Sequence, residues 1–520
     1  MSTTAASAPN SGSSIDQIRD AFTRLESEIH GSDARMFKST SLDAVREAAR
    51  IIERDQGQRR TLRNLRKIEP LCQALGRFGG AIETLCQGTP YLCFIWAPIK
   101  LMLQIADDYT QGFKILVDAY GQIAQHLPRL DRFASVFADQ PDFQAVLADV
   151  YTDLVDFHLH AYKLLRRPGW KLLFDASWRG FQARFNAILR GLSENKRLID
   201  DEANSFNILE AKAFRTRLYA SLEREESDRR IWQLRDTVAW LDLKGLDREQ
   251  EDLFERRSQA RNPDTCHWIL NNSAIATWLD EEDQRPFVWL HGKPGSGKTT
   301  LATYLAEHCA LSPSSDLLYC LCSYGFGKAE QNPCGLLLRS LIAQLLRRHT
   351  DLLPYVYDNY VKLGAVPSLK NIKELLFLLL DSLGTIFLIL DGLDECEAIH
   401  QKQMLAELTA LRQIPGNRPS GAARLKVLIC SRETKDIQRK LIKVPTVSLS
   451  KQQFVDRDIA IFVRNSLQEL VERFEEAIVH ELERDLVSKA DGELYPNQVF
   501  ERTHVQQGCF CGHSSLWRLY

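Results

Sequence analysis

One short run of the chain dictates the local fold around it: His291-Gly-Lys-Pro-Gly-Ser-Gly-Lys-Thr-Thr300. From Gly292 it matches the pattern G-x-x-x-x-G-K-[ST], which arises by chance in a chain this long about one or two times in a hundred. The apolar run Phe287–Leu290 before it predicts a strand, and Leu301–His308 after it predicts a helix. This order of strand, glycine-rich turn and helix suits phosphate binding. The plainer alternative is a glycine-rich turn that binds nothing.

A bound phosphate would give the residues of this loop separate roles. Glycines let backbone N–H groups turn inward without a Cβ clash. Lys298 would reach the β- and γ-phosphates, and the Thr299 hydroxyl would coordinate Mg²⁺. The candidate nucleotide-binding residues are Gly292, Lys293, Pro294, Gly295, Ser296, Gly297, Lys298, Thr299 and Thr300.

Two further strand-like runs end in polar residues. Ile386–Leu390 delivers Asp391, the expected Mg²⁺ partner of Thr299, at the strand end where α/β sheets bind ligands. Asp394 and Glu395 follow within one turn and could position or deprotonate an attacking water. Val427–Cys430 leads to Arg432, which would lie near the γ-phosphate if this strand lies between the other two. Asp394, Glu395 and Arg432 are the candidate catalytic residues. The plainer alternative for each is an ordinary solvated strand end, and pairing with the upstream loop favours the site.

The pattern of apolar residues predicts a multidomain fold. From Ser14 to about Leu246, apolar residues recur at spacings of three and four, as in Ile15–Ile29, Ile68–Ile82, Ile99–Phe133, Val146–Leu165 and Phe181–Leu198, which predicts an all-helical bundle. From about Asn262, helices alternate with short apolar runs, which predicts an α/β domain with a parallel sheet. The predicted strands are Phe287–Leu290, Leu317–Tyr324, Ile386–Leu390, Leu425–Cys430 and Thr446–Leu449.

Composition limits the classes of partner. Sixty-six Lys and Arg nearly balance 68 Asp and Glu among 520 residues, so no general attraction to nucleic acid is expected. No apolar run approaches the roughly 20 residues that cross a bilayer. The 12 scattered cysteines are typical of reduced core thiols. The N-terminus has no basic and apolar signal regions, so a cytoplasmic location is expected.

The three polar elements together resemble the NACHT class of STAND P-loop NTPases. A small residue after the first aspartate, then two acids three and four positions on, separates NACHT from AAA+ proteins, and Asp391-Gly-Leu-Asp-Glu395 has this pattern. Asn262–Leu270 is similar to the stretch before the phosphate loop in fungal NACHT proteins of the nephrocystin-like subgroup. Gly335–Leu346 and Tyr91–Phe133 are similar to further helices of those proteins. The resemblance covers about residues 65–492.

The resemblance implies a sheet in which the Arg432 strand lies between the two phosphate-binding strands. It implies ATP or GTP with Mg²⁺ as ligand, and a nucleotide switch that controls opening and self-association through the NACHT and N-terminal helical domains. Members commonly act in innate immunity or in vegetative (heterokaryon) incompatibility. They usually continue past Ala490–Gly492 with winged-helix and repeat domains, whereas Glu493 onward is unrelated here, so the chain resembles a truncated or differently spliced member.

The expected organisation has six segments. These are a disordered leader (1–14), a helical domain (15–220, core about 65–205), a charged helical linker (221–261), the NACHT domain (262–450), a partial helical domain (451–492) and a divergent tail (493–520). The tail run Cys509-Phe-Cys-Gly-His513 lacks a fourth ligand and predicts no zinc site.

The leading hypothesis is a nucleotide-dependent switch with slow NTPase activity. A nucleotide-binding helical scaffold without turnover or assembly is the rival, because the domains that usually follow are missing. A P-loop kinase or small GTPase is disfavoured, because no Asn-Lys-x-Asp guanine motif follows the loop.

Overall fold

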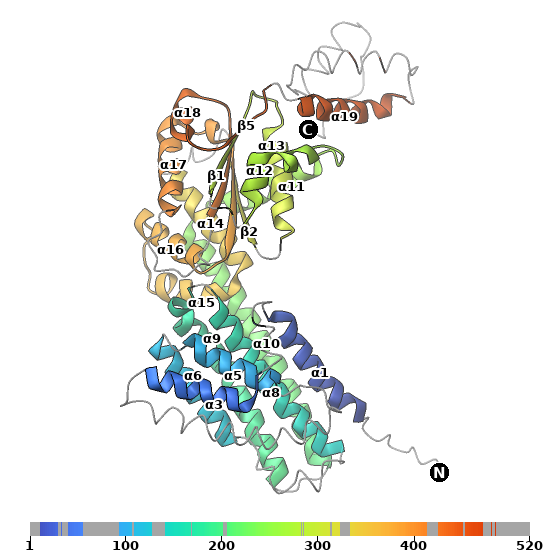
Figure 1. Cartoon of the computed structure of the whole chain (residues 1–520), viewed down its shortest axis with the longest axis vertical. Coiled ribbons are helices and arrows are strands. Elements are labelled where there is room, and N and C mark those ends of the chain that lie inside the picture. Colours follow the sequence, from blue (N-terminus) through green and yellow to red (C-terminus); the bar gives the residue numbers. More distant parts are fainter. Residues whose placement is uncertain are drawn as a thin grey trace. The chain divides into compact units, whose positions relative to one another are not determined.

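The chain forms two compact units. In the computed structural model, Met1–Thr237 and Thr350–Gly364 make the first unit, and Val238–His349 and Ala365–Tyr520 make the second. The first is helical and the second contains a β-sheet (Figure 1). The structure describes residues 11–29, 33, 40–55, 93–106, 109–126, 141–167, 169–200, 205–281, 283, 285–312, 315–322, 333–412, 425–450, 453–471, 480 and 484.

The helical unit packs around an aromatic-rich core. Tyr120, Tyr151, Phe157 and Phe185 are at most 1% exposed, as amphipathic helices with apolar stripes require. A later part of the chain adds η3 (Thr350–Leu352), α15 (Leu353–Val356) and η4 (Tyr357–Val361). The long helices of this unit are α1 (Ser11–Glu28), α3 (Leu42–Asp55), α5 (Cys93–Ala106), α6 (Thr110–His126), α8 (Pro141–Arg166), α9 (Trp170–Asp200) and α10 (Ser205–Leu241), the last of which runs on into the second unit.

Two expectations for this region need correction. Helix α1 begins at Ser11, inside the expected leader, because adding a turn to a helix whose Phe22 and Leu25 are already buried costs little. Within the run Ile99–Phe133 the structure describes two helices, α5 ending at Ala106 and α6 spanning Thr110–His126. The expected helix Ile68–Ile82 lies outside the described residues.

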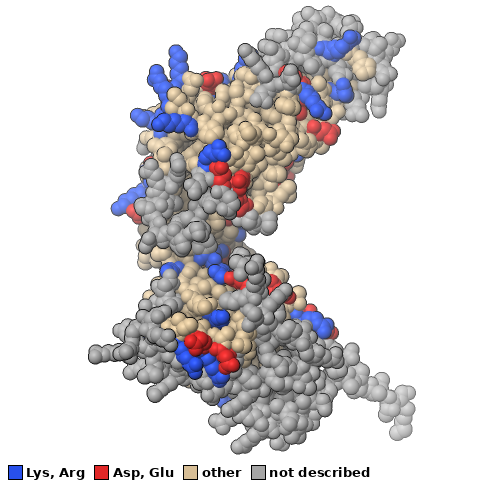
Figure 2. Space-filling view, viewed as in Figure 1, with Lys and Arg blue, Asp and Glu red and all other residues tan. Residues whose placement is uncertain are grey.

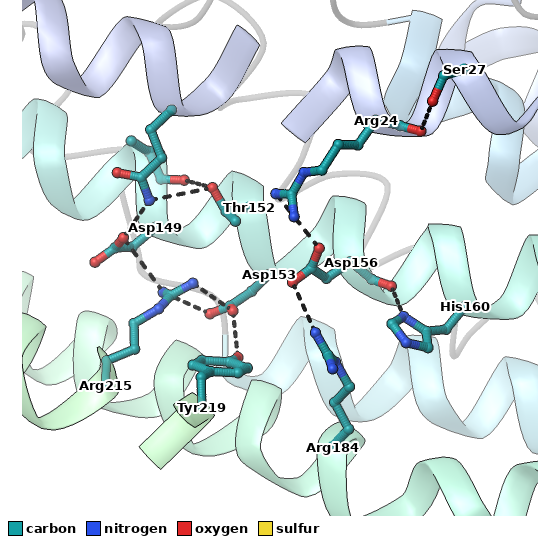
Figure 3. Close-up of polar contacts among 12 residues, drawn as sticks. Arg24, Ser27, Asp149, Thr152, Asp153, Asp156, His160, Arg184, Arg215 and Tyr219 are labelled. Atoms are coloured by element: carbon teal, nitrogen blue, oxygen red, sulfur yellow. Dashed lines mark hydrogen bonds and ion pairs between the residues drawn. The ribbon is translucent and has the colours of Figure 1, made fainter. Parts of the chain in front are cut away.

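A buried polar network ties α10 to α8 (Figure 3). Arg215 donates two hydrogen bonds to the fully buried carboxylate of Asp153, at 2.7 and 3.0 Å, and the Tyr219 hydroxyl donates a third at 2.7 Å. Burial raises the pKa of Asp153 to about 7, although Arg215 and Tyr219 act in the opposite direction. Asp156, one turn further along α8, lies 4.0 Å from Arg24 and 3.8 Å from Arg184.

The second unit contains a five-stranded parallel sheet in the order β2-β3-β4-β1-β5. Its strands are β1 (Phe287–His291), β2 (Ser315–Leu321), β3 (Thr385–Asp391), β4 (Leu425–Ser431) and β5 (Thr446–Ser448). The all-parallel sheet confirms the predicted α/β class, and β4 lies between β3 and β1 as the resemblance implied. Strand β2 ends at Leu321, before the predicted Tyr324, which lies outside the described residues.

Helices cover the sheet and complete its core (Figure 1). Central strands β3 and β4 are almost continuously buried, which explains their unbroken apolar runs. The helical elements of this unit are α11 (Leu246–Gln259), η2 (His267–Asn271), α12 (Ser273–Leu279), α13 (Lys298–Ala310), α14 (Pro333–Arg348), α16 (Leu369–Asp381), η5 (Leu393–Glu395), α17 (Ala398–Arg412), α18 (Lys435–Leu441) and α19 (Gln453–Val471).

Charged and thiol side chains follow simple patterns. Figure 2 shows Lys and Arg gathered where Figure 1 places α17 and α18. Lys402 of α17, Arg439 of α18 and Lys443 just after it are exposed.

Seven cysteines of the second unit are buried and free, as expected for core thiols. No helix among the described residues has the length and apolar character needed to span a membrane.

Candidate functional site

The glycine-rich run forms a tight turn between β1 and α13. Gly295 and Gly297 have φ values of 75° and 82°, a left-handed backbone that side chains other than glycine rarely adopt. A Cβ at Gly292 would lie 2.6 Å from Ser296 Oγ and 2.9 Å from Leu449 Cβ. The loop therefore needs glycine at these positions, and it leads directly into the N-terminus of a 13-residue helix.

Two polar side chains of the loop, those of Lys298 and Ser296, bear on whether an anion can bind there. The Lys298 ammonium folds back and donates to the carbonyls of Gly292 and Lys293, at 3.0 and 2.6 Å. Burial lowers the pKa of Lys298, although Asp394 and Asp391 favour its charged form. Ser296 is 4% exposed, and its buried Oγ has no hydrogen-bond partner. A cation and a hydroxyl held this way are well suited to an anion entering the loop.

Asp391 ends β3 directly beside the first turn of α13. Thr299 lies close enough to lower the pKa of its carboxyl group, so the two residues predicted to share a magnesium ion are neighbours. Asp391 is 5% exposed, and burial raises its pKa to about 6, although Thr299 and Lys298 lower it. Strand order explains this proximity, because β4 alone separates β3 from β1 and all three strands point the same way.

Asp394 is engaged by Arg432. Its carboxylate accepts a hydrogen bond from the Arg432 backbone N–H at 2.8 Å and forms an ion pair with the Arg432 guanidinium, whose Nε lies 3.0 Å away. The Asp394 side chain is 6% exposed and the Arg432 side chain 54% exposed. Asp394 therefore fixes the β4 end, while Glu395 is exposed at the end of η5. The sequence predicted all three residues at this site but not the pairing.

Sequence reasoning missed the side chains that fix the strand ends. Trp289 Nε1 donates to Ser431 Oγ at 2.9 Å, and that hydroxyl donates to the Arg432 carbonyl at 3.0 Å. Cys322 N–H donates to the Asp391 carbonyl at 2.8 Å, which fixes the end of β2 against that of β3. Nothing in the sequence around Trp289 indicates this hydrogen bond, because the indole N–H meets Ser431 only where β1 and β4 pair.

The residues present fit a triphosphate with magnesium. Hydroxyl and carboxylate oxygens from Thr299 and Asp391 are the hard donors that Mg²⁺ prefers. The first N–H groups of α13 have no partner within the helix and direct partial positive charge at the loop. Lys298 adds a full cation within the same turn. The strand, the glycine-rich turn and the helix with these donors have the arrangement of a phosphate-binding loop.

Comparisons with known proteins match two stretches of the chain. Residues 264–432 match the family model described as "Nephrocystin 3, N-terminal", and residues 66–210 match a "Domain of unknown function (DUF7708)". The chain is 28% identical over 188 residues to the vegetative incompatibility protein HET-E-1 of Podospora anserina. This match covers 34% of the chain and 13% of that relative.

The fold and these matches support a likeness to fungal NACHT-type NTPases. The chain matches only a small part of HET-E-1, so the relative's function is not transferred by the match alone. The helical unit contains the second family match, whose description carries no function.

Proposed function

We propose that the protein binds ATP or GTP with Mg²⁺ and acts as a nucleotide-dependent switch with slow hydrolysis. The observation that carries the proposal is that Thr299 and Asp391 are neighbours beside Lys298. A buried carboxylate, a hydroxyl and a cation at one helix N-terminus form a costly arrangement for a chain that binds no ion. Triphosphate and metal would neutralise these charges.

Each residue of the site has an assigned task in this proposal. The backbone of Gly292–Thr300 and the Lys298 ammonium would bind the β- and γ-phosphates. Thr299 and Asp391 would hold Mg²⁺, which neutralises charge on the phosphates when bound. Arg432, fixed by Asp394, would contact the γ-phosphate and register its presence.

Glu395, the exposed acid at the end of η5, would act in hydrolysis. Glu395 would accept a proton from the attacking water. The water oxygen would bond to the γ-phosphorus while the bond from that phosphorus to the nucleoside diphosphate breaks. Asp394 is a poorer base because Arg432 already occupies both carboxylate oxygens. The catalytic set is therefore Glu395 and Arg432, with Asp394 supporting Arg432.

The cellular role proposed for this switch is signalling in the cytoplasm, such as the signalling that acts in vegetative incompatibility. The support is the similarity of the chain to the vegetative incompatibility protein HET-E-1. Self-association through the NACHT and helical parts would be the output of the triphosphate state. A nucleotide-binding scaffold without turnover is the second candidate, favoured by the tie between Asp394 and Arg432, which leaves one acid for catalysis.

Nucleotide binding and phosphate release test the proposal. Saturating Mg-ATP or Mg-GTP, at about 100 times Kd, should raise the free energy of unfolding by about 2.7 kcal/mol. Lys298→Ala should abolish this gain, whereas Lys402→Ala, on the exposed face of α17, should keep it. No gain with either triphosphate would exclude both candidates. A gain without phosphate release, unchanged by Glu395→Gln, would favour the scaffold.

A further inference from the structure

The edge of the sheet next to Asp391 is closed by glutamine side chains. Among the described residues β2 is an edge strand of the sheet, so its outward N–H and C=O groups have no neighbouring strand there. Gln344 of α14 accepts from Tyr319 N–H at 3.0 Å and donates to the Tyr319 carbonyl at 2.8 Å. Gln250 of α11 makes the same pair of bonds with Leu321, at 2.6 and 2.9 Å.

These two glutamines occupy different places relative to the site. Gln344 binds in the middle of β2, whereas Gln250 binds its last residue. The N–H of the next residue, Cys322, points to the other side of the strand, toward β3, and donates to the Asp391 carbonyl at 2.8 Å. The end of β2 is thus held from outside by Gln250 and from inside by Asp391.

The contact between β2 and the Asp391 loop is close. A Cβ at Gly392 would lie 2.4 Å from the Cys322 carbonyl oxygen, so any outward or inward shift of Cys322 changes the room for this loop. Gly392 has a φ of 75° and begins the turn that carries Asp394 and Glu395. The position of β2's last residues therefore limits the conformation of the whole acidic turn.

Helix α11 is firmly fixed along this edge. Gln250 is 2% exposed, Arg347 of α14 forms ion pairs with Asp247 and with Glu251, the latter at 2.9 Å, and the Phe254 ring stacks on Tyr319 with centroids 4.6 Å apart. A buried amide on a fixed helix can hold a backbone in one place, because its own position leaves little freedom.

We propose that Gln250 is a positioning residue for the magnesium–nucleotide site: it holds Leu321–Cys322 against Asp391–Gly392 and so sets the place of the Asp391 carboxylate. This inference rests on the proposed function. Gln250 touches neither nucleotide nor metal and acts through two backbone contacts. Gln344, which makes identical bonds two residues away, serves only to cap the edge.

The first experiment uses the full chain without nucleotide. Amide hydrogen exchange is measured at Cys322, Gly392 and Glu395 in Gln250→Leu and in the matched Gln344→Leu. Gln250→Leu should accelerate exchange at Gly392 and Glu395 about fivefold or more, and Gln344→Leu by less than about twofold. Equal effects of the two variants, or no effect of Gln250→Leu, would overturn the proposal. Gln250→Glu, which keeps the acceptor for Leu321 N–H, replaces Gln250→Leu if that variant does not fold.

The second experiment measures the Mg²⁺ concentration that gives half-maximal nucleotide binding. Loss of a residue that supports a metal ligand typically weakens metal binding by tenfold or more, so Gln250→Leu should raise this concentration about tenfold, and Gln344→Leu by less than about twofold. Equal shifts would reduce Gln250 to an edge cap and overturn the proposal. If the unmodified chain binds no nucleotide, the proposed function fails, and the exchange experiment still decides whether Gln250 positions the Asp391 turn.

Discussion

At the scale of the residue, buried polar side chains join elements that are far apart in the sequence. Asp153 joins α8 to α10, Asp394 joins η5 to the end of β4, and Gln250 joins α11 to the end of β2. Each has its partners within hydrogen-bond distance, as a buried polar group must to offset lost hydration. Single substitutions at such residues are expected to have large and specific effects.

Protonation of Asp153 is expected to make stability depend on pH. Its pKa of about 7 in the folded protein lies above the unfolded value near 3.9, so the folded state holds this proton to higher pH. The free energy of unfolding should fall as pH rises from about 4 to about 7, by at most about 4 kcal/mol from this group. Thermal unfolding between pH 4.5 and 8 measures this slope.

The control variants separate Asp153 from other carboxylates. Asp153→Asn removes the titration and should flatten the pH profile, besides lowering stability because an NH₂ group replaces one of the two oxygens that accept from Arg215. Asp228→Asn, on an exposed position of α10, should keep the slope of the unmodified chain. A pH profile of Asp153→Asn parallel to the original would disprove this assignment.

Gly392 is expected to tolerate no side chain. Gly392→Ala would strain a left-handed backbone and place Cβ 2.4 Å from the Cys322 carbonyl oxygen, and should cost about 2 kcal/mol or more. Gly245→Ala has the same backbone strain at φ +86° with no atom within 4 Å, and should cost about 1 kcal/mol. Denaturant unfolding compares the two, and equal losses would contradict the steric argument.

At the scale of the element, the turn between α10 and α11 has unusual backbone geometry. Asp242, Lys244 and Gly245 have φ values of 51°, 52° and 86°, and only the last residue is a glycine. Left-handed residues with a Cβ cost free energy that the surrounding packing must offset. Leu241 and Leu246, on either side of the turn, are buried and fix the two helix ends.

Relief of this strain gives an element-scale prediction. Lys244→Gly should raise the free energy of unfolding by about 0.5 kcal/mol, because glycine accepts φ 52° but loses more chain entropy on folding. Arg229→Gly, at an exposed position inside α10, should lower it by about 1 kcal/mol. Thermal unfolding of both variants is the measurement, and destabilisation by Lys244→Gly would refute the strain.

At the scale of the whole molecule, the chain passes between the two units three times, after Thr237, after His349 and after Gly364. The 350–364 segment, expected inside the α/β domain, is part of the helical unit. Its Leu352, Leu353 and Val356 are fully buried, and Asp358 pairs with Arg179 of α9 at 3.2 Å. A segment that follows α14 in the chain is therefore part of the helical unit.

Shortening a buried side chain of this segment should destabilise the helical unit alone. Leu353→Ala should cost about 2–5 kcal/mol and accelerate amide exchange in α9, while protection of β3 stays unchanged. Leu363→Ala, at a side chain 73% exposed, should change stability by less than about 0.5 kcal/mol. Faster exchange in β3 than in α9 after Leu353→Ala would contradict this placement.

The sequence by itself determined the local elements and the chemistry of the loop. Strands β1, β3 and β4 follow from unbroken apolar runs, and the turn before Lys298 follows from glycines whose backbone no other residue adopts readily. Asp391 was predictable beside Thr299 because carboxyl ends of parallel strands share one edge of the sheet.

Only the tertiary structure decided which side chains fix those elements to one another. The amide of Gln250, the indole of Trp289 and the carboxylate of Asp394 each find a partner at least 38 residues away, and no sequence period marks such a pair. The sequence also does not show that residues 350–364 belong to the helical unit, because the apolar residues of this segment would suit either core. Periodicity is local along the chain, whereas a buried polar contact depends on how separate elements pack.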